Sequence, residues 1–188
     1  MKLQPILTAI LFASIAAGAI AQDAAPDPAL LARAQAGEAA AQVELGEAYG
    51  SGKGVERDLQ QAAVWYRKAA GQGDLAGEMH LANLLRDGGK GLPRNPAEAA
   101  KWFEKAAEAG EVTAQASLGV MYQYGQGVTR NEVEAYFWFD LAAQSAGPNQ
   151  PRYAASRQML GQHVTMDDLE AEQARLKHWL KTHPSPAK

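Results

Sequence analysis

The side chains in this sequence with the greatest potential for chemistry are its four histidines, and their spacing argues against a metal site. His178 and His183 are five residues apart, which does not match the His-x-x-x-His or His-Glu-x-x-His pattern of helical zinc sites. Two histidines rarely suffice to hold zinc, and the chain has no cysteine that could complete the site. We interpret His80 as a surface residue of a helix. The sequence therefore predicts no metal and no cofactor.

Glycine and lysine together could bind phosphate, as they do in the Gly-x-x-x-x-Gly-Lys-Ser/Thr loop. In the turns Gly52–Gly54 and Gly89–Gly91, however, glycine follows the lysine where Ser or Thr is required. The related turn Gly125–Gly127 has glutamine in place of lysine. We interpret all three as turns between helices in which glycine adopts a positive φ.

Nucleophilic catalysis finds no support in the sequence either. The chain lacks cysteine, which excludes a catalytic thiolate, and it has no Gly-x-Ser-x-Gly motif. Its only Ser-x-x-Lys motif spans Ser185–Lys188 at the extreme C-terminus, where no preorganised site could form. The sequence therefore predicts a protein that is not an enzyme.

The three glycine turns mark an internal repeat. Each turn leads to an Asp or Asn and then to the pattern Ala-x-x-Trp-aromatic-x-x-Ala-Ala. Trp65, Trp102 and Trp138 consequently lie 37 and then 36 residues apart. A period in this range is typical of a solenoid of helix pairs, which offers a long surface more readily than a closed pocket.

The pattern predicts that each copy consists of two antiparallel helices, A and B. Helix A of the first copy spans about residues 38–50, with Ala41, Leu45 and Tyr49 on one face. Beside this face lies a small residue in every copy, which predicts close helix packing at that position. These small residues are Gly46, Ala82 and Gly119.

Helix B is predicted to begin at a repeated N-cap. Asp58, Asn95 and Asn131 are the expected cap residues. Gln or Glu follows three positions later in every copy, which is close to a capping box. We expect the tryptophan of each helix B to be buried in the stack of repeats.

These motifs resemble the Sel1-like repeat family, which is related to tetratricopeptide repeats. The first copy reads Leu-Gly-x-x-Tyr-x-x-Gly-x-Gly-Val over residues 45–55 and Ala-x-x-Trp-Tyr-x-x-Ala-Ala-x-x-Gly over residues 62–73. The second copy departs from it with Ala82 and Leu85 and with one extra residue near Gly88. The resemblance implies an all-α, right-handed α-solenoid of three helix-turn-helix repeats, and it implies an adaptor or scaffold for other proteins.

The first 21 residues have the features of an export signal. Lys2 precedes an apolar stretch from Ile6 to Ile20, and Ala19-Ile20-Ala21 matches a small-x-small cleavage site. A membrane anchor is the alternative, but fifteen helical residues reach only about 22 Å of the roughly 30 Å that a hydrocarbon core requires. Without cysteine the protein cannot be a lipoprotein, so we expect a periplasmic or secreted protein.

The remaining boundaries follow from the repeat. We expect a capping helix in residues 22–36, and repeats over 37–73, 74–110 and 111–146. Residues 147–188 would form C-terminal capping helices and a tail, after a break at Gly147–Pro151. We expect a helix from about residue 152 to 160, and a last helix that starts at Thr165 and docks on the third repeat.

The chain carries a net charge of −3, which argues against nucleic acid as a partner. We expect a protein or peptide partner in the bacterial envelope, bound in the groove of the A helices, with self-association as a further option. The C-terminal helices are an alternative binding site. An envelope hydrolase, a peptidoglycan-active enzyme and an obligate accessory subunit of one complex are the alternative functions. The predicted groove residues are Glu47, Asn83, Arg86, Val120, Gln123 and Tyr124.

Overall fold

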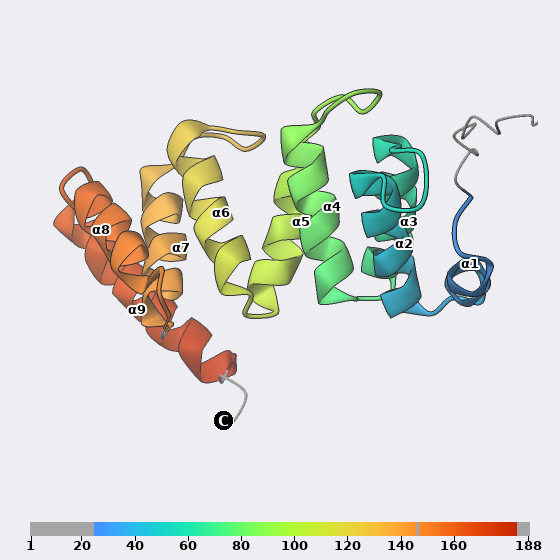
Figure 1. Ribbon diagram of the computed structural model, residues 1–188. Coiled ribbons are helices and arrows are strands. Elements are labelled where there is room, and N and C mark those ends of the chain that lie inside the picture. Colours follow the sequence, from blue (N-terminus) through green and yellow to red (C-terminus); the bar gives the residue numbers. More distant parts are fainter. Residues whose placement is uncertain (1–24, 146, 184–188) are drawn as a thin grey trace, which may run out of the picture.

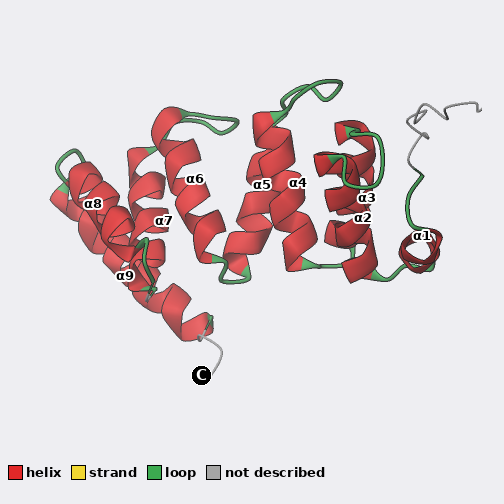
Figure 2. Cartoon of the chain, viewed as in Figure 1, coloured by secondary structure: helices red, strands yellow, loops and turns green. Residues whose placement is uncertain are grey.

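The computed structural model describes residues 25–145 and 147–183, so the predicted export signal lies outside the described residues. The described residues form nine α-helices and no β-strand. The helices between residues 39 and 144 stand side by side in a row of antiparallel pairs, which is the all-α solenoid that the repeat predicts, and the helix of residues 28–35 is seen end-on beside them (Figures 1 and 2). The described helices are α1 Pro28–Gln35, α2 Ala39–Ser51, α3 Leu59–Gly71, α4 Leu75–Asp87, α5 Pro96–Glu108, α6 Val112–Tyr124, α7 Glu132–Gln144, α8 Gln150–Gly161 and α9 Met166–Thr182.

The three repeats are the pairs α2/α3, α4/α5 and α6/α7, and each predicted N-cap of a second helix is confirmed. The side chain of Asp58 accepts hydrogen bonds from the backbone N–H of Gln60 and Gln61, and Asn95 and Asn131 cap their helices in the same way. The other half of the capping box is absent. Each cap residue instead donates its own N–H to a carbonyl near the end of the first helix, as Asp58 does to Tyr49 over 2.9 Å. This bond fixes the two helices of a repeat to each other.

Close packing at the predicted small residues is confirmed. A Cβ on Gly46 would lie 2.5 Å from the ring of Tyr66, and one on Gly119 would lie 2.9 Å from the ring of Phe139. In the first and third repeats, an aromatic ring of the second helix therefore lies directly on the backbone of the first helix. The glycine turns also adopt the predicted positive φ, for example 79° at Gly52 and 67° at Gly125.

A polar position recurs inside the stack. Gln42 and Gln115 are buried, and their side-chain amides donate to the carbonyls of Ala34 and Ala107 at the end of the preceding helix, over 3.1 and 3.3 Å. The second repeat has Glu78 at this position, and a carboxylate cannot donate to a carbonyl. Lys105 supplies the donor instead, because its Nζ lies 2.5 Å from Glu78 Oε1 and 3.2 Å from the carbonyl of Ala70. These polar contacts thus tie the second and third repeats to the repeat before them, and Gln42 ties the first repeat to α1.

Burial of the tryptophans is confirmed for two of the three. Trp65 and Trp138 are 7% and 6% exposed, whereas Trp102 is only partly buried. Helix α1 helps to cover Trp65 through Leu30 and Leu31. Trp102 keeps an edge at the surface, where its Nε1 lies 3.5 Å from Glu98 and the Lys105 ammonium lies 5.4 Å from its ring centre.

The C-terminal helices close the array in different ways. Helix α8 starts at Gln150, two residues earlier than predicted, so Pro151 lies in its first turn, where a missing N–H is harmless. Helix α8 packs along α7, as a next repeat would, and Tyr153 is buried in that contact. Met159 of the same helix is 48% exposed.

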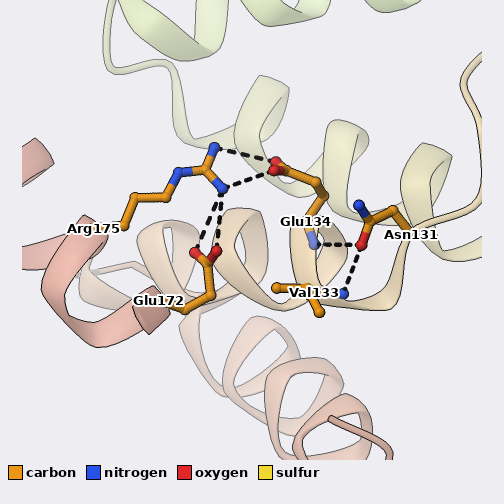
Figure 3. A network of polar contacts seen from close by, with 5 residues as sticks. All are labelled: Asn131, Val133, Glu134, Glu172 and Arg175. Carbon is orange, nitrogen blue, oxygen red and sulfur yellow. Dashed lines mark hydrogen bonds and ion pairs between the residues drawn. The ribbon is translucent and has the colours of Figure 1, made fainter. Parts of the chain in front are cut away.

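Helix α9 turns back and lies against α7. Leu176 and Trp179 pack on the main core, and the guanidinium of Arg175 lies 3.8 Å from the ring centre of Phe137. Arg175 also binds Glu134 of α7 through both terminal nitrogens, over 2.8 and 3.1 Å (Figure 3). None of the helices in the described part of the chain combines the length and apolar character needed to cross a membrane.

Candidate protein-binding site

A concave site of about 440 Å³ lies between α6 and α8, and we call it the α6–α8 cavity. Helix α6 contributes Val120, Gln123 and Tyr124 along one wall, and α8 contributes the facing wall. Arg86 reaches it from α4, so the cavity extends across two repeats. A second concavity, of about 490 Å³, adjoins the first through Gln123, Tyr124 and Met159, and it is also lined by the ion pair of Arg130 and Glu132.

The structure brings four of the six predicted groove residues together in this cavity, namely Arg86, Val120, Gln123 and Tyr124. The other two lie elsewhere. Oε1 of Glu47 lies 3.1 Å from Nε2 of His80, and Asn83 donates its side-chain N–H to the carbonyl of Met79 one turn earlier in its own helix.

Large apolar side chains are exposed at the cavity. Tyr124 is 64% exposed, Met159 is 48% exposed and Val120 is 36% exposed. Isolated exposed apolar residues are ordinary, but a concave group of them is a feature of interaction sites. Aromatic, methionine and arginine side chains are also the types that protein interfaces favour. The cavity therefore has the composition of a protein-binding site.

The charges that line the cavity are all positive. Arg86 and Arg152 line it, and no carboxylate does so among the residues that the structure describes. Arg86 is held by Asp87, which accepts from its Nε and Nη2 over 2.8 and 3.1 Å. The hydrogen bond from Arg86 lowers the pKa of the Asp87 carboxyl below its ordinary value. Arg152 has no side-chain partner within the described ranges.

Sequence reasoning named the C-terminal helices as an alternative binding site but did not identify the α8 residues that form this wall of the cavity. Arg152, Tyr153, Ser156 and Met159 all line it, yet α8 carries no copy of the repeat motif that would assign a face to them. The only signal was the expectation of a short helix after a chain break, and this expectation does not say which neighbour the helix packs against.

His80 lies at the surface, as interpreted, with 42% of its side chain exposed, and it also packs on the preceding repeat. Its ring stacks on Tyr66 of the preceding repeat, with centroids 5.0 Å apart and planes 13° apart. Burial, together with the nearby charge of Glu47, raises the pKa of Tyr66 to about 12. Because Tyr66 lies on Gly46, this stack connects the first two repeats. His80 is therefore a packing residue between repeats.

The described residues contain no cluster of three or more His, Asp or Glu side chains that could hold a metal ion. Near the chain end, the ring of His183 stacks on Trp179 with centroids 4.3 Å apart. The α6–α8 cavity likewise presents no nucleophile paired with a base. Its chemistry is that of apolar contact and of hydrogen bonds to anions.

Comparison with known proteins identifies the repeat. The model of the Sel1 repeat matches residues 39–74, 76–111 and 112–146. The chain is 33% identical to a protective antigen of uropathogenic Escherichia coli with an SLR fold, with a TM-score of 0.69 over 82% of this chain. It spans only 32% of that antigen's length. A Sel1 repeat protein from Oxalobacter formigenes is 31% identical with a TM-score of 0.57, over 66% of this chain and 92% of its own length. No curated protein is similar enough to count as a match.

Proposed function

Because this chain belongs to the Sel1 repeat family, whose members are generally protein-interaction scaffolds, we propose that it is a non-catalytic adaptor for a protein or peptide in the bacterial envelope. The observation that carries the proposal is the α6–α8 cavity. It joins exposed apolar side chains to an arginine without a partner in the described chain, on the side of the array formed by the first helices of the repeats.

The geometry of the cavity supports a peptide-sized ligand. Its walls are helices that pack on buried hydrophobic clusters, so the site is largely formed before a partner arrives. A preformed site avoids part of the ordering cost of binding. Of the six predicted groove residues, we propose Arg86, Val120, Gln123 and Tyr124 as partner-binding residues.

The envelope location is supported by the sequence of residues 1–21, which has the charge, the apolar stretch and the cleavage pattern of an export signal. The similar E. coli protein is a protective antigen, which agrees with exposure outside the cytoplasm. Cell fractionation followed by N-terminal sequencing tests this part of the proposal. We expect a mature protein that begins at Gln22 and is released with the periplasmic or secreted fraction.

Affinity capture from envelope extracts tests the adaptor role. Val120→Asp places a charge in the cavity, and Val64→Asp is its matched control on α3, because Val64 is 43% exposed and lies outside the cavity. We expect one partner that the parent and Val64→Asp proteins retain and that Val120→Asp loses. If that partner is a second copy of the chain, light scattering will show the same loss. Hydrolysis of peptidoglycan by the purified protein would overturn the proposal in favour of an envelope enzyme.

A further inference from the structure

The charge of the α6–α8 cavity is opposite to that of the protein. The chain carries 21 acidic and 18 basic side chains, yet its cavity is lined by two arginines and by no carboxylate of the described chain. Arg130 and Arg67, by contrast, are each paired with a carboxylate, Glu132 and Glu98 respectively. The lining of the cavity therefore favours an anionic group.

The two arginines are not equivalent. Arg86 is 30% exposed in its side chain, and its Nε and Nη2 are already bound to Asp87. Arg152 is exposed, and its guanidinium has no partner in residues 25–145 and 147–183. It lies in the first turn of α8, where a positive charge opposes the helix dipole. Arg152 thus does nothing for the stability of its own helix, and its full charge remains available to a ligand.

We infer that the α6–α8 cavity selects a peptide segment that combines a carboxylate with a large apolar side chain. The carboxylate binds the guanidinium of Arg152, with Arg86 as a weaker second contact, because arginine presents a fork that matches a carboxylate. The apolar side chain packs on Val120, Tyr124 and Met159, whose exposed surfaces line the same cavity. This inference rests on the proposed adaptor function and adds the chemistry of the partner.

A library of random 12-residue peptides displayed on phage, selected on the full chain, tests the inference. Selected peptides would be synthesised, and their affinities measured by fluorescence anisotropy against the parent, Arg152→Glu, Val120→Asp and Lys177→Glu proteins. Lys177 is an exposed residue of α9 outside the cavity, so Lys177→Glu changes the net charge by the same amount as Arg152→Glu. Glutamate in the first turn of α8 suits the helix dipole, so Arg152→Glu should not unfold the site.

We expect the selected peptides to carry Asp or Glu close to Phe, Trp, Leu or Met. Arg152→Glu and Val120→Asp should each weaken binding by about ten-fold or more, and Lys177→Glu should leave it unchanged. Changing the peptide's acid to Lys should restore binding to Arg152→Glu, and added salt should weaken binding to the parent.

Two results would overturn the inference, and they can be told apart. Peptides that need Val120 but tolerate Arg152→Glu, or that lack acidic residues, would leave the adaptor function standing and refute the acidic ligand. Selected peptides that tolerate both Val120→Asp and Arg152→Glu would refute the cavity as the binding site, and the proposed function at this site would fail with it.

Discussion

The buried contact between Glu78 and Lys105 allows a test of how the repeats hold together. Only 3% of the Glu78 side chain is exposed, and its Oε1 lies 2.5 Å from Lys105 Nζ, which also donates to the carbonyl of Ala70. In the first and third repeats Gln42 and Gln115 make the corresponding bond without a lysine. We therefore predict that Lys105→Ala is damaging in the natural chain and nearly harmless in a chain that also carries Glu78→Gln.

The magnitude follows from burial. Removing one partner of a fully buried ion pair costs about 3–5 kcal/mol, but the Lys105 side chain is 49% exposed, so we reduce the expected loss to about 2–3 kcal/mol. For a chain of this size that corresponds to a fall in Tm of about 5–10 °C. Glu78→Gln should change stability by less than about 1 kcal/mol, because its amide can donate to Ala70 as the other two glutamines donate in their repeats. The coupling between the two substitutions should then exceed about 1.5 kcal/mol.

Urea denaturation of the parent, both single variants and the double variant measures this coupling. Lys101→Ala is the matched control, since Lys101 is exposed on the same helix and has no ion pair in the described residues. We expect the control to lie within about 0.5 kcal/mol of the parent. An equal loss from Lys105→Ala in both backgrounds would show that Lys105 does not act through Glu78, and the reasoning would be refuted.

Three further predictions concern packing and pH. Gly46→Ala should lower the free energy of unfolding by about 1–3 kcal/mol, because the new Cβ would meet the Tyr66 ring. Gly71→Ala should raise it by up to about 1 kcal/mol, because a Cβ there meets nothing within 4 Å. Urea denaturation of both variants measures the two changes. Burial raises the pKa of Glu172, so the folded state disfavours its charged form. Glu172→Gln should therefore raise Tm at neutral pH and lose that advantage below about pH 4, and a gain that grows in acid would contradict this. Trp138→Phe should cost less than about 1.5 kcal/mol in thermal denaturation, because the buried indole N–H has no partner in the described chain; a loss near the 3–5 kcal/mol typical of truncation to alanine would contradict this.

The repeated part of the fold could be predicted from the sequence because each feature occurs three times. The caps at Asp58, Asn95 and Asn131 and the small residues beside the first helices gave one consistent pattern, and the structure confirms it. The recurrence of Gln42, Glu78 and Gln115 in the same register was a signal of equal quality that was overlooked. A polar residue on a helix does not reveal by itself that its partner is a carbonyl of the preceding repeat.

The parts that break the pattern were less predictable. The position of Arg152 and Met159 depends on α8 packing against α7, and no second copy of α8 exists to compare. His80 aligns with residues that have no common role, so its stack on Tyr66 followed only from the three-dimensional arrangement. The repeat therefore predicted the cavity residues on α4 and α6, whereas the cavity residues on α8 could be identified only from the structure.

The contact of α9 with Phe137 limits how this array could grow by gene duplication. Phe137 is 2% exposed, whereas the corresponding residues of the first two repeats are the 43% exposed Val64 and the exposed Lys101. A duplicated third repeat would carry a second copy of Phe137 for which there is no second α9, and that ring would face water. Copies of the first or second repeat bring no such residue. A duplicated repeat therefore avoids exposing an apolar ring only if it is a copy of the first or second repeat inserted before the third. The third repeat stays joined to α8 and α9 at the C-terminal end of the array.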